Sequence, residues 1–283
     1  MYKLQSLITQ CKLTVLNGGR CPILTKVSAD YKNKFNISNY PFDYKGTMHE
    51  EVGKKIADMY QSIEHKPNAE LVKGAYQQLA KEVIMQFQFI TDNSKIEFEP
   101  YADKGEPYAN SYEMLVDIHH YHMYFFKTES GFGETEYMET NLMLNKTGFK
   151  IGDYELVVND LFRIIHDIFG HAMNGNGFGP KGEDSAWFDH LKMFSPLAAS
   201  ALSTETRGQN CWVNFGMHLR DENNQLWKKG QNQWVPFSER PFAEQKMNIL
   251  PSCATGIKVY KEKNKVKARY TDFWDPFLSV LNT

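Results

Sequence analysis

The chain has 283 residues, of which 42% are hydrophobic and 23% are charged, and its formal net charge is -2. This balance is typical of a folded globular protein, and it excludes a disordered or collagen-like chain and a general positive field for nucleic acid. No stretch approaches the roughly 18 uncharged apolar residues of a membrane span, and we expect no signal peptide. The four cysteines form no CxxC pair, so we expect reduced thiols and a cytoplasmic protein without a membrane partner.

In the first half of the chain, short β-prone pieces mixed with turn residues predict an irregular N-terminal layer over 1–45. Helical spacing of apolar residues predicts a helix over 47–63 and a second over 67–90. Residues 94–100 alternate in the manner of a strand. Residues 112–126 fit either a helix followed by a strand or one long strand, and periodicity does not decide between them.

The second half begins with a β-like piece near 142–144, followed by a helix from about Val158 that Asn159 or Asp160 would cap. Another helix is expected over about 184–201. Residues 258–269 are basic and alternate like a charged edge hairpin, with a nucleic-acid role as the weaker alternative. Together these elements predict the α+β class: a predominantly helical single domain over 1–283 with a few short strands.

The two histidines at the end of the helix from Val158 are the strongest functional signal. His166 and His171 are five residues apart, so on a straight α-helix they would diverge by about 140°. Gly170 can end or distort the helix and let the second imidazole swing back toward the first. The sequence therefore predicts a metal site within helices spanning 158–216, with His166 and His171 as ligands.

A third ligand should be a carboxylate from another element. Glu205 lies at the start of an amphipathic stretch from which it could face the histidines, and we expect it to be the ligand. Glu183 is the alternative, although an acid in a first helical turn is common because it complements the helix dipole. Two imidazoles and one carboxylate are the ligands that hold Fe(II) in oxygenases, and the same set holds catalytic zinc.

The run HDIFGH (166–171), followed by Glu205 within TET (204–206), resembles the iron site of the pterin-dependent aromatic amino acid hydroxylases. The resemblance implies Fe(II) as cofactor, histidine ligands at both ends of the run and a later glutamate. It also implies pterin, although no pterin-binding loop aligns. The longer wording over 159–216 (NDLFRIIHDIFGH…GFGPKGE…MFSPLA…TETRGQNCWVNFG) resembles an uncharacterised group of proteins from phages and prophage-like regions, which would act in the cytoplasm of a host cell.

Several neighbouring residues have two interpretations. Asp167 would either orient a histidine ligand or lie on a solvated helix face. Arg207 would either hold an acidic group of a substrate or pair with Glu205 or Asp184. Gln209 and Asn210 would belong to the pocket only in the first case. A second histidine group at 119–122 has no carboxylate partner at a defined spacing, and we expect surface or packing roles for it.

These residues predict a non-haem Fe(II) oxygenase or hydroxylase that acts on a small or nucleotide-linked substrate. A metal-dependent hydrolase is the first alternative, with Zn or Mn activating water and Asp167 or Glu183 as the base. A phage-associated binding or structural protein with a structural metal is the second. The sequence predicts neither the substrate nor the oligomeric state.

Overall fold

Helices dominate the computed structural model, which describes residues 21–37, 41, 48–103, 105–132 and 138–271. Within these residues the strands form three two-stranded sheets, and the predicted α+β class with a predominance of helix is confirmed. None of the described helices is long and apolar enough to span a bilayer.

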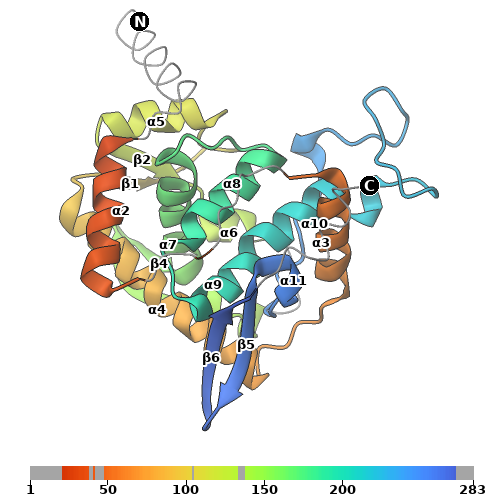
Figure 1. The fold of residues 1–283 in the computed structure, drawn as a ribbon. Coiled ribbons are helices and arrows are strands. Elements are labelled where there is room, and N and C mark those ends of the chain that lie inside the picture. Colours follow the sequence, from red (N-terminus) through yellow and green to blue (C-terminus); the bar gives the residue numbers. More distant parts are fainter. Residues whose placement is uncertain (1–20, 38–40, 42–47, 104, 133–137, 272–283) are drawn as a thin grey trace, which may run out of the picture.

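In its described residues, the first half of the chain forms five helices and one parallel strand pair (Figure 1). The helices predicted near 47–63 and 67–90 are confirmed, as is the strand near 94–100. The ambiguous stretch is a helix followed by a strand. The elements are α2 (Pro22–Phe35), α3 (Glu50–Ser62), α4 (Glu70–Asn93), β1 (Glu97–Pro100), α5 (Ser111–His119), β2 (His122–Phe125) and α6 (Thr128–Gly131).

The second half contains the helices that build the site, together with two hairpins. Its elements are η1 (Met138–Thr140), η2 (Leu142–Leu144), β3 (Lys146–Ile151), β4 (Tyr154–Val157), α7 (Val158–His166), η3 (Asp167–Ala172), α8 (Pro180–Leu191), α9 (Pro196–Ser203), η4 (Thr204–Gly208), α10 (Gln209–Phe215), η5 (Met217–Leu219), η6 (Phe237–Glu239), α11 (Ser252–Thr255), β5 (Ile257–Glu262) and β6 (Lys265–Tyr270). Of these, η3 and η4 are π-helical. The predicted hairpin is confirmed: Lys263 and Asn264 have positive φ, as a two-residue turn requires.

Three predicted boundaries were wrong. The irregular layer expected over 1–45 contains helix α2, whereas residues 1–20 lie outside the described part. The expected β-like piece at 142–144 is a 3-10 turn. The helix expected over 184–201 is two helices, because a residue before proline disfavours helical geometry and Ser195 instead caps a new helix that begins at Pro196.

The start of α7 also differs from the predicted cap. The helix begins at Val158 as predicted, but its N-cap is Val157 rather than Asn159 or Asp160, and Asp160 acts from the third helical position. The Asp160 carboxylate accepts a hydrogen bond of 2.9 Å from the backbone N–H of Val157 and one of 2.8 Å from that of Thr128. Asp160 thus joins the start of α7 to the start of α6.

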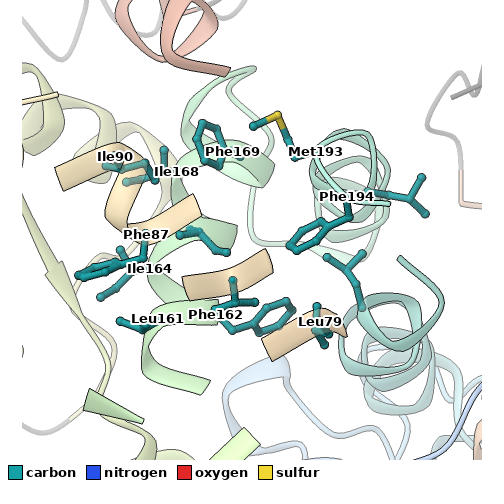
Figure 2. Close-up of a cluster of buried hydrophobic side chains, with 14 of the residues drawn as sticks. Leu79, Phe87, Ile90, Leu161, Phe162, Ile164, Ile168, Phe169, Met193 and Phe194 are labelled. Atoms are coloured by element: carbon teal, nitrogen blue, oxygen red, sulfur yellow. The ribbon is translucent and has the colours of Figure 1, made fainter. Parts of the chain in front are cut away.

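The main core surrounds the length of α4. Its Leu79, Phe87 and Ile90 pack against apolar residues of α7, η3 and the turn that follows α8 (Figure 2). The residues that meet α4 in this view are Leu161, Phe162, Ile164, Ile168, Phe169, Met193 and Phe194. A smaller core joins α3 to α10 and to residues 243–254. The segment that carries His166 and His171 is therefore held in place by its packing against α4.

Candidate metal centre

The backbone changes from α to π hydrogen bonding where α7 runs into η3. The N–H of Met173 donates to the carbonyl of Ile168 at 2.8 Å, and that of Asn176 donates to the carbonyl of His171 at 3.0 Å, both across five residues. A π turn places residues five apart above one another, so His166 and His171 share a face. Their ring centroids are 5.1 Å apart. The helix is distorted near Gly170, as the sequence predicted, but by widening rather than by ending.

One glycine allows α8 to approach this π turn closely, and another allows the loop before α8 to fold against the start of that helix. A Cβ atom on Gly170 would lie 3.0 Å from the carbonyl oxygen of Ala186 and 3.1 Å from the His166 ring. A Cβ on Gly182 would lie 1.9 Å from the carbonyl oxygen of Gly177. Only glycine fits at these contacts without displacing α8 or the loop before it. The close crossing brings the first turn of α8 against the histidines.

Glu183, in that first turn, completes a group of three donors. Its Oε2 atom lies 3.4 Å from Nε2 of His171 and 3.9 Å from Nε2 of His166. One ligand atom from each residue can be chosen so that all three lie within 4.8 Å of one another. Atoms bonded to a single ion at about 2.1 Å lie up to about 4.2 Å apart, so the two Glu183 separations suit a shared ion.

The three polar side chains of this group are buried to different degrees, and Glu183 is the most exposed of them. The side chain of His171 is 2% exposed and that of His166 is 11% exposed, whereas Glu183 is 28% exposed. Phe178 covers the His171 ring edge-on, with centroids 5.1 Å apart. Access from solvent therefore runs past the Glu183 carboxylate and the loop that carries Phe178.

Glu205 lies elsewhere. Its carboxylate accepts hydrogen bonds from the Tyr76 hydroxyl and, at 2.9 Å, from the side-chain amide of Gln209. Burial raises the pKa of Glu205 to about 7, although these two donors act against the shift. The structure thus brings Glu183, and not the expected Glu205, to the two histidines. The reason is that α9 ends in its own π segment, η4, which turns Glu205 toward α4.

The charges within the group are coupled. Burial lowers the pKa of His171, but the negative charges of Glu183 and Asp167 outweigh it and raise the pKa to about 9. Burial raises the pKa of Glu183, but the two imidazoles outweigh it and lower the pKa to about 2. His166 has a lowered pKa, chiefly because of burial. Without a metal, an imidazolium at His171 therefore faces a carboxylate at Glu183.

Asp167 lies at the start of the π turn, beside the group. Burial raises its pKa to about 7, against the positive charges of His171 and Arg163. Its own charge raises the pKa of His171. Asp167 is half-buried rather than on a solvated face, and it acts on His171 through its charge; no hydrogen bond from Asp167 to a histidine is present among the described contacts, so the orienting role stays a prediction.

Arg207 takes the pairing role among its predicted alternatives. Its side chain is 1% exposed, and Nε donates to the completely buried Asp184 at 2.9 Å. Nη1 donates to the carbonyl of Ala254 at 2.7 Å, and the guanidinium lies 4.1 Å from the ring centre of Trp187. Arg207 therefore cannot hold an acidic substrate group in this conformation. Gln209 is occupied by Glu205 and Gln245, and Asn210 donates to the carbonyl of Pro180.

The sequence did not point to His190, which contacts a residue of the centre. It is completely buried, and its Nδ1 lies 3.1 Å from Nδ1 of His166. Burial lowers the pKa of His190 well below its ordinary value, and the two other histidines add to the shift. One signal was available: His190 follows Glu183 by seven residues, which places both on one face of α8.

A pocket of about 650 Å³ lies next to the first turn of α8. It is bounded by the starts of α3 and α8 and by the end of α10. Lys181 is the cationic lining residue, and Gly182, beside Glu183 in the chain, is another lining residue. The remaining lining residues are Met48, His49, Glu50, Gly179, Pro180 and Phe215. The pocket offers room for a small molecule, although none of its lining residues is one of the three donors.

Of the histidines at 119–122, His119 and His120 are exposed, whereas His122 has the carboxylate partners that the sequence did not predict. His122 is 25% exposed, and its Nδ1 and Nε2 lie 2.8 Å and 3.3 Å from carboxylate oxygens of Asp117 and Glu99. Within the described residues, the only group with three metal-ligand atoms close together is His166, His171 and Glu183.

Comparison with known proteins adds no relative: the chain matches no protein-family model, no curated protein and no solved structure. The chemistry of the centre must therefore be inferred from its own residues.

Proposed function

We propose that the protein binds one transition-metal ion through His166, His171 and Glu183 and acts as a non-haem Fe(II)-dependent oxygenase or hydroxylase. The observation that carries this proposal is the convergence of two imidazole Nε2 atoms and one carboxylate oxygen at a partly open, otherwise buried point. Two histidines and one carboxylate with open positions are the donor set of non-haem Fe(II) oxygenases. The carboxylate is Glu183, the alternative that the sequence offered.

The three donors fit a catalytic ion better than a structural one. Structural zinc sites have four protein ligands, whereas catalytic sites keep a position for water or substrate. Here the group contains three donors, and Glu183 is its most exposed member. This count argues against a metal that only stabilises the fold of a phage-associated binding or structural protein.

When bound, Fe(II) would supply the activation of dioxygen. The chain's own residues would orient the ion and exclude bulk water, with Phe178 packed on His171. The pocket beside Gly182 would take a small or nucleotide-linked substrate, whose acidic group would meet Lys181, because Arg207 is already paired with Asp184. Nothing among the described residues calls for a pterin.

A metal-dependent hydrolase is the second candidate, and one observation favours it. Asp167 is a half-buried carboxyl beside the centre, with a pKa raised to about 7. A carboxyl with a pKa near neutrality is suited to act as a general base toward a water on Zn or Mn. The identity of the bound metal separates the two reactions.

The test is metal analysis of the protein purified without added metal and then loaded anaerobically with Fe(II), Zn or Mn. We expect one equivalent of metal in the wild type, and none in His171→Ala or Glu183→Ala. Glu205→Gln is the matched control, because it changes a buried glutamate outside the group, and it should keep the metal. Metal content that is unchanged in Glu183→Ala would refute the site.

Oxygen consumption by the iron-loaded protein with candidate substrates then tests the reaction. Turnover that requires iron and fails in Glu183→Ala supports an oxygenase. Exclusive binding of Zn or Mn, with hydrolysis and no oxygen uptake, would overturn it in favour of the hydrolase.

A further inference from the structure

A line of buried hydrogen bonds leads away from the back of His166. His166 Nδ1 lies 3.1 Å from Nδ1 of His190, and Nε2 of His190 lies 3.2 Å from Oε1 of Gln86. The side-chain amide of Gln86 donates to the carbonyl of Met193 at 3.1 Å. Gln86 and His190 are both completely buried. The line therefore joins α7, α8 and α4 out of reach of bulk water.

The direction of every hydrogen bond in this line follows from its last member. The carbonyl of Met193 can only accept, so the NH2 group of Gln86 must point toward it. The Gln86 oxygen then faces His190 and can only accept, which places a proton on Nε2 of His190. A neutral imidazole that donates through Nε2 accepts through Nδ1. His166 must therefore donate from Nδ1, and its Nε2 keeps a free lone pair.

The other histidine is oriented by the same logic. Nδ1 of His171 lies 3.2 Å from the backbone carbonyl of Asn176, which can only accept. Asn176 is itself held, because its side-chain amide donates to the carbonyl of Gly170 at 2.7 Å and to Asp189 at 2.9 Å. Both histidines thus carry a proton on Nδ1, the ring nitrogen that points away from Glu183, and both turn Nε2 toward Glu183.

We propose that His190, oriented by Gln86, is a positioning residue that sets the His166 tautomer, so that the Nε2 lone pair is directed at the metal. This inference rests on the proposed function for the identity of the ligands. In metal-binding histidines, the ring nitrogen that does not bind the metal donates a hydrogen bond that fixes the orientation of the ring. Loss of the partner of this hydrogen bond commonly weakens metal affinity about 10- to 100-fold.

The aromatic surroundings of His190 allow its hydrogen bond to His166 to be tested without loss of packing. The His190 ring lies among Phe162, Phe169 and Phe194, at centroid distances of 6.0, 6.3 and 4.8 Å. A phenylalanine at position 190 would fill the same aromatic space while removing the acceptor for His166. His190→Phe is therefore the informative variant, and Gln86→Met removes the preceding link.

The first experiment reads the tautomers directly in the metal-free protein. In protein labelled with 15N-histidine, two-bond 15N–1H correlations should show His166 protonated at Nδ1 and His190 protonated at Nε2. Gln86→Met should abolish the strong preference of His190. The opposite tautomers in the wild type would overturn the proposal. This measurement involves no metal, so it stays decisive even if the proposed function fails.

The second experiment measures the dissociation constant of Co(II), used as a probe, by its visible absorption. We expect His190→Phe and Gln86→Met each to weaken binding about 10- to 100-fold. Val83→Ala is the matched control: it shortens a completely buried side chain of α4 one turn before Gln86 and should leave the affinity unchanged. Unchanged affinity in His190→Phe, or equal weakening in Val83→Ala, would refute the role. Absence of Co(II) binding in the wild type would refute the proposed function instead.

Discussion

The two π-helical segments of this protein, η3 and η4, carry different chemistry on the same backbone feature. Both continue an α-helix without a break, and both contribute a basic side chain that meets an acid of α8. The acids are neighbours in the chain: Glu183 faces His171 of η3, and Asp184 pairs with Arg207 of η4. Adjacent helical residues point about 100° apart, so one turn of α8 serves both segments.

The difference lies in the permanence of the charges. Arg207 is charged at every accessible pH, and its pair with Asp184 is sealed, with side chains 1% and 0% exposed. The histidines of η3 can lose a proton and offer lone pairs, and Glu183 stays 28% exposed. A sealed pair of permanent ions stabilises a packing arrangement, whereas a partly open group of titratable donors can exchange protons for a metal ion.

The largest expected effect separates the two neighbouring acids. Asp184→Asn leaves the buried Arg207 charge without its carboxylate, and we expect a loss of about 3 to 5 kcal/mol in the free energy of unfolding. Glu183→Gln in the metal-free protein should cost about 1 kcal/mol, because His171 can become neutral by releasing its proton. Urea denaturation of both variants measures the difference. Equal losses would show that the two clusters are not distinct.

A second prediction concerns the pH dependence that Glu205 contributes. Its folded pKa of about 7 lies above the ordinary 4.5. Between these values the folded state keeps a proton that the unfolded state has lost. Stability should therefore fall as the pH rises from 4.5 to 7, by about 2 to 3 kcal/mol. Glu205→Gln should remove this fall in urea denaturation at pH 5 and pH 7.5.

Glu183 should show the opposite dependence of stability on pH. Its folded pKa of about 2 lies below the ordinary 4.5, so its stabilisation is present above pH 4.5 and is lost as the pH falls toward 2. Glu183→Gln should therefore reduce the acid sensitivity of the metal-free protein. A shared sign of the pH effect for the two glutamates would contradict their different environments.

A further expected effect on stability comes from Gly170, the glycine at the contact between η3 and α8. Gly170→Ala places a methyl group 3.0 Å from the Ala186 carbonyl, so α8 must shift. We expect a loss of about 1 to 3 kcal/mol and weaker metal binding, since Glu183 moves with α8. Gly177→Ala is the matched control, because its Cβ would meet nothing within 4 Å. Calorimetric unfolding and Co(II) titration of the two variants provide the comparison.

Local patterns were sufficient for much of the fold. Apolar spacing located α3, α4 and α7, because each buries one continuous stripe of its own residues. Alternation located the β5–β6 hairpin. The helix α2 was missed because its turn-rich surroundings obscure a modest stripe of Leu24, Val27 and Tyr31.

The candidate site was predictable in part for the same reason. His166 and His171 belong to one helix and flank a glycine, so their proximity is a local property. The choice of carboxylate ligand is not a local property, because Glu183 and Glu205 both lie near the start of a later helical stretch and the sequence does not show which one meets the histidines. Their roles follow from the close approach of α8 to η3 at Gly170 and from the hydrogen bond between Glu205 and Tyr76.

By itself, the sequence determined the helical class, the histidine pair and the presence of acids that could join it. Only the tertiary structure decided that Glu183 meets the histidines, that Arg207 is sealed against Asp184, and that His190 stands behind His166. The physical reason is that each of these contacts joins different helices, and its distance is set by how closely those helices pack, as at Gly170 against Ala186. Packing of this kind leaves no periodic trace in a single chain.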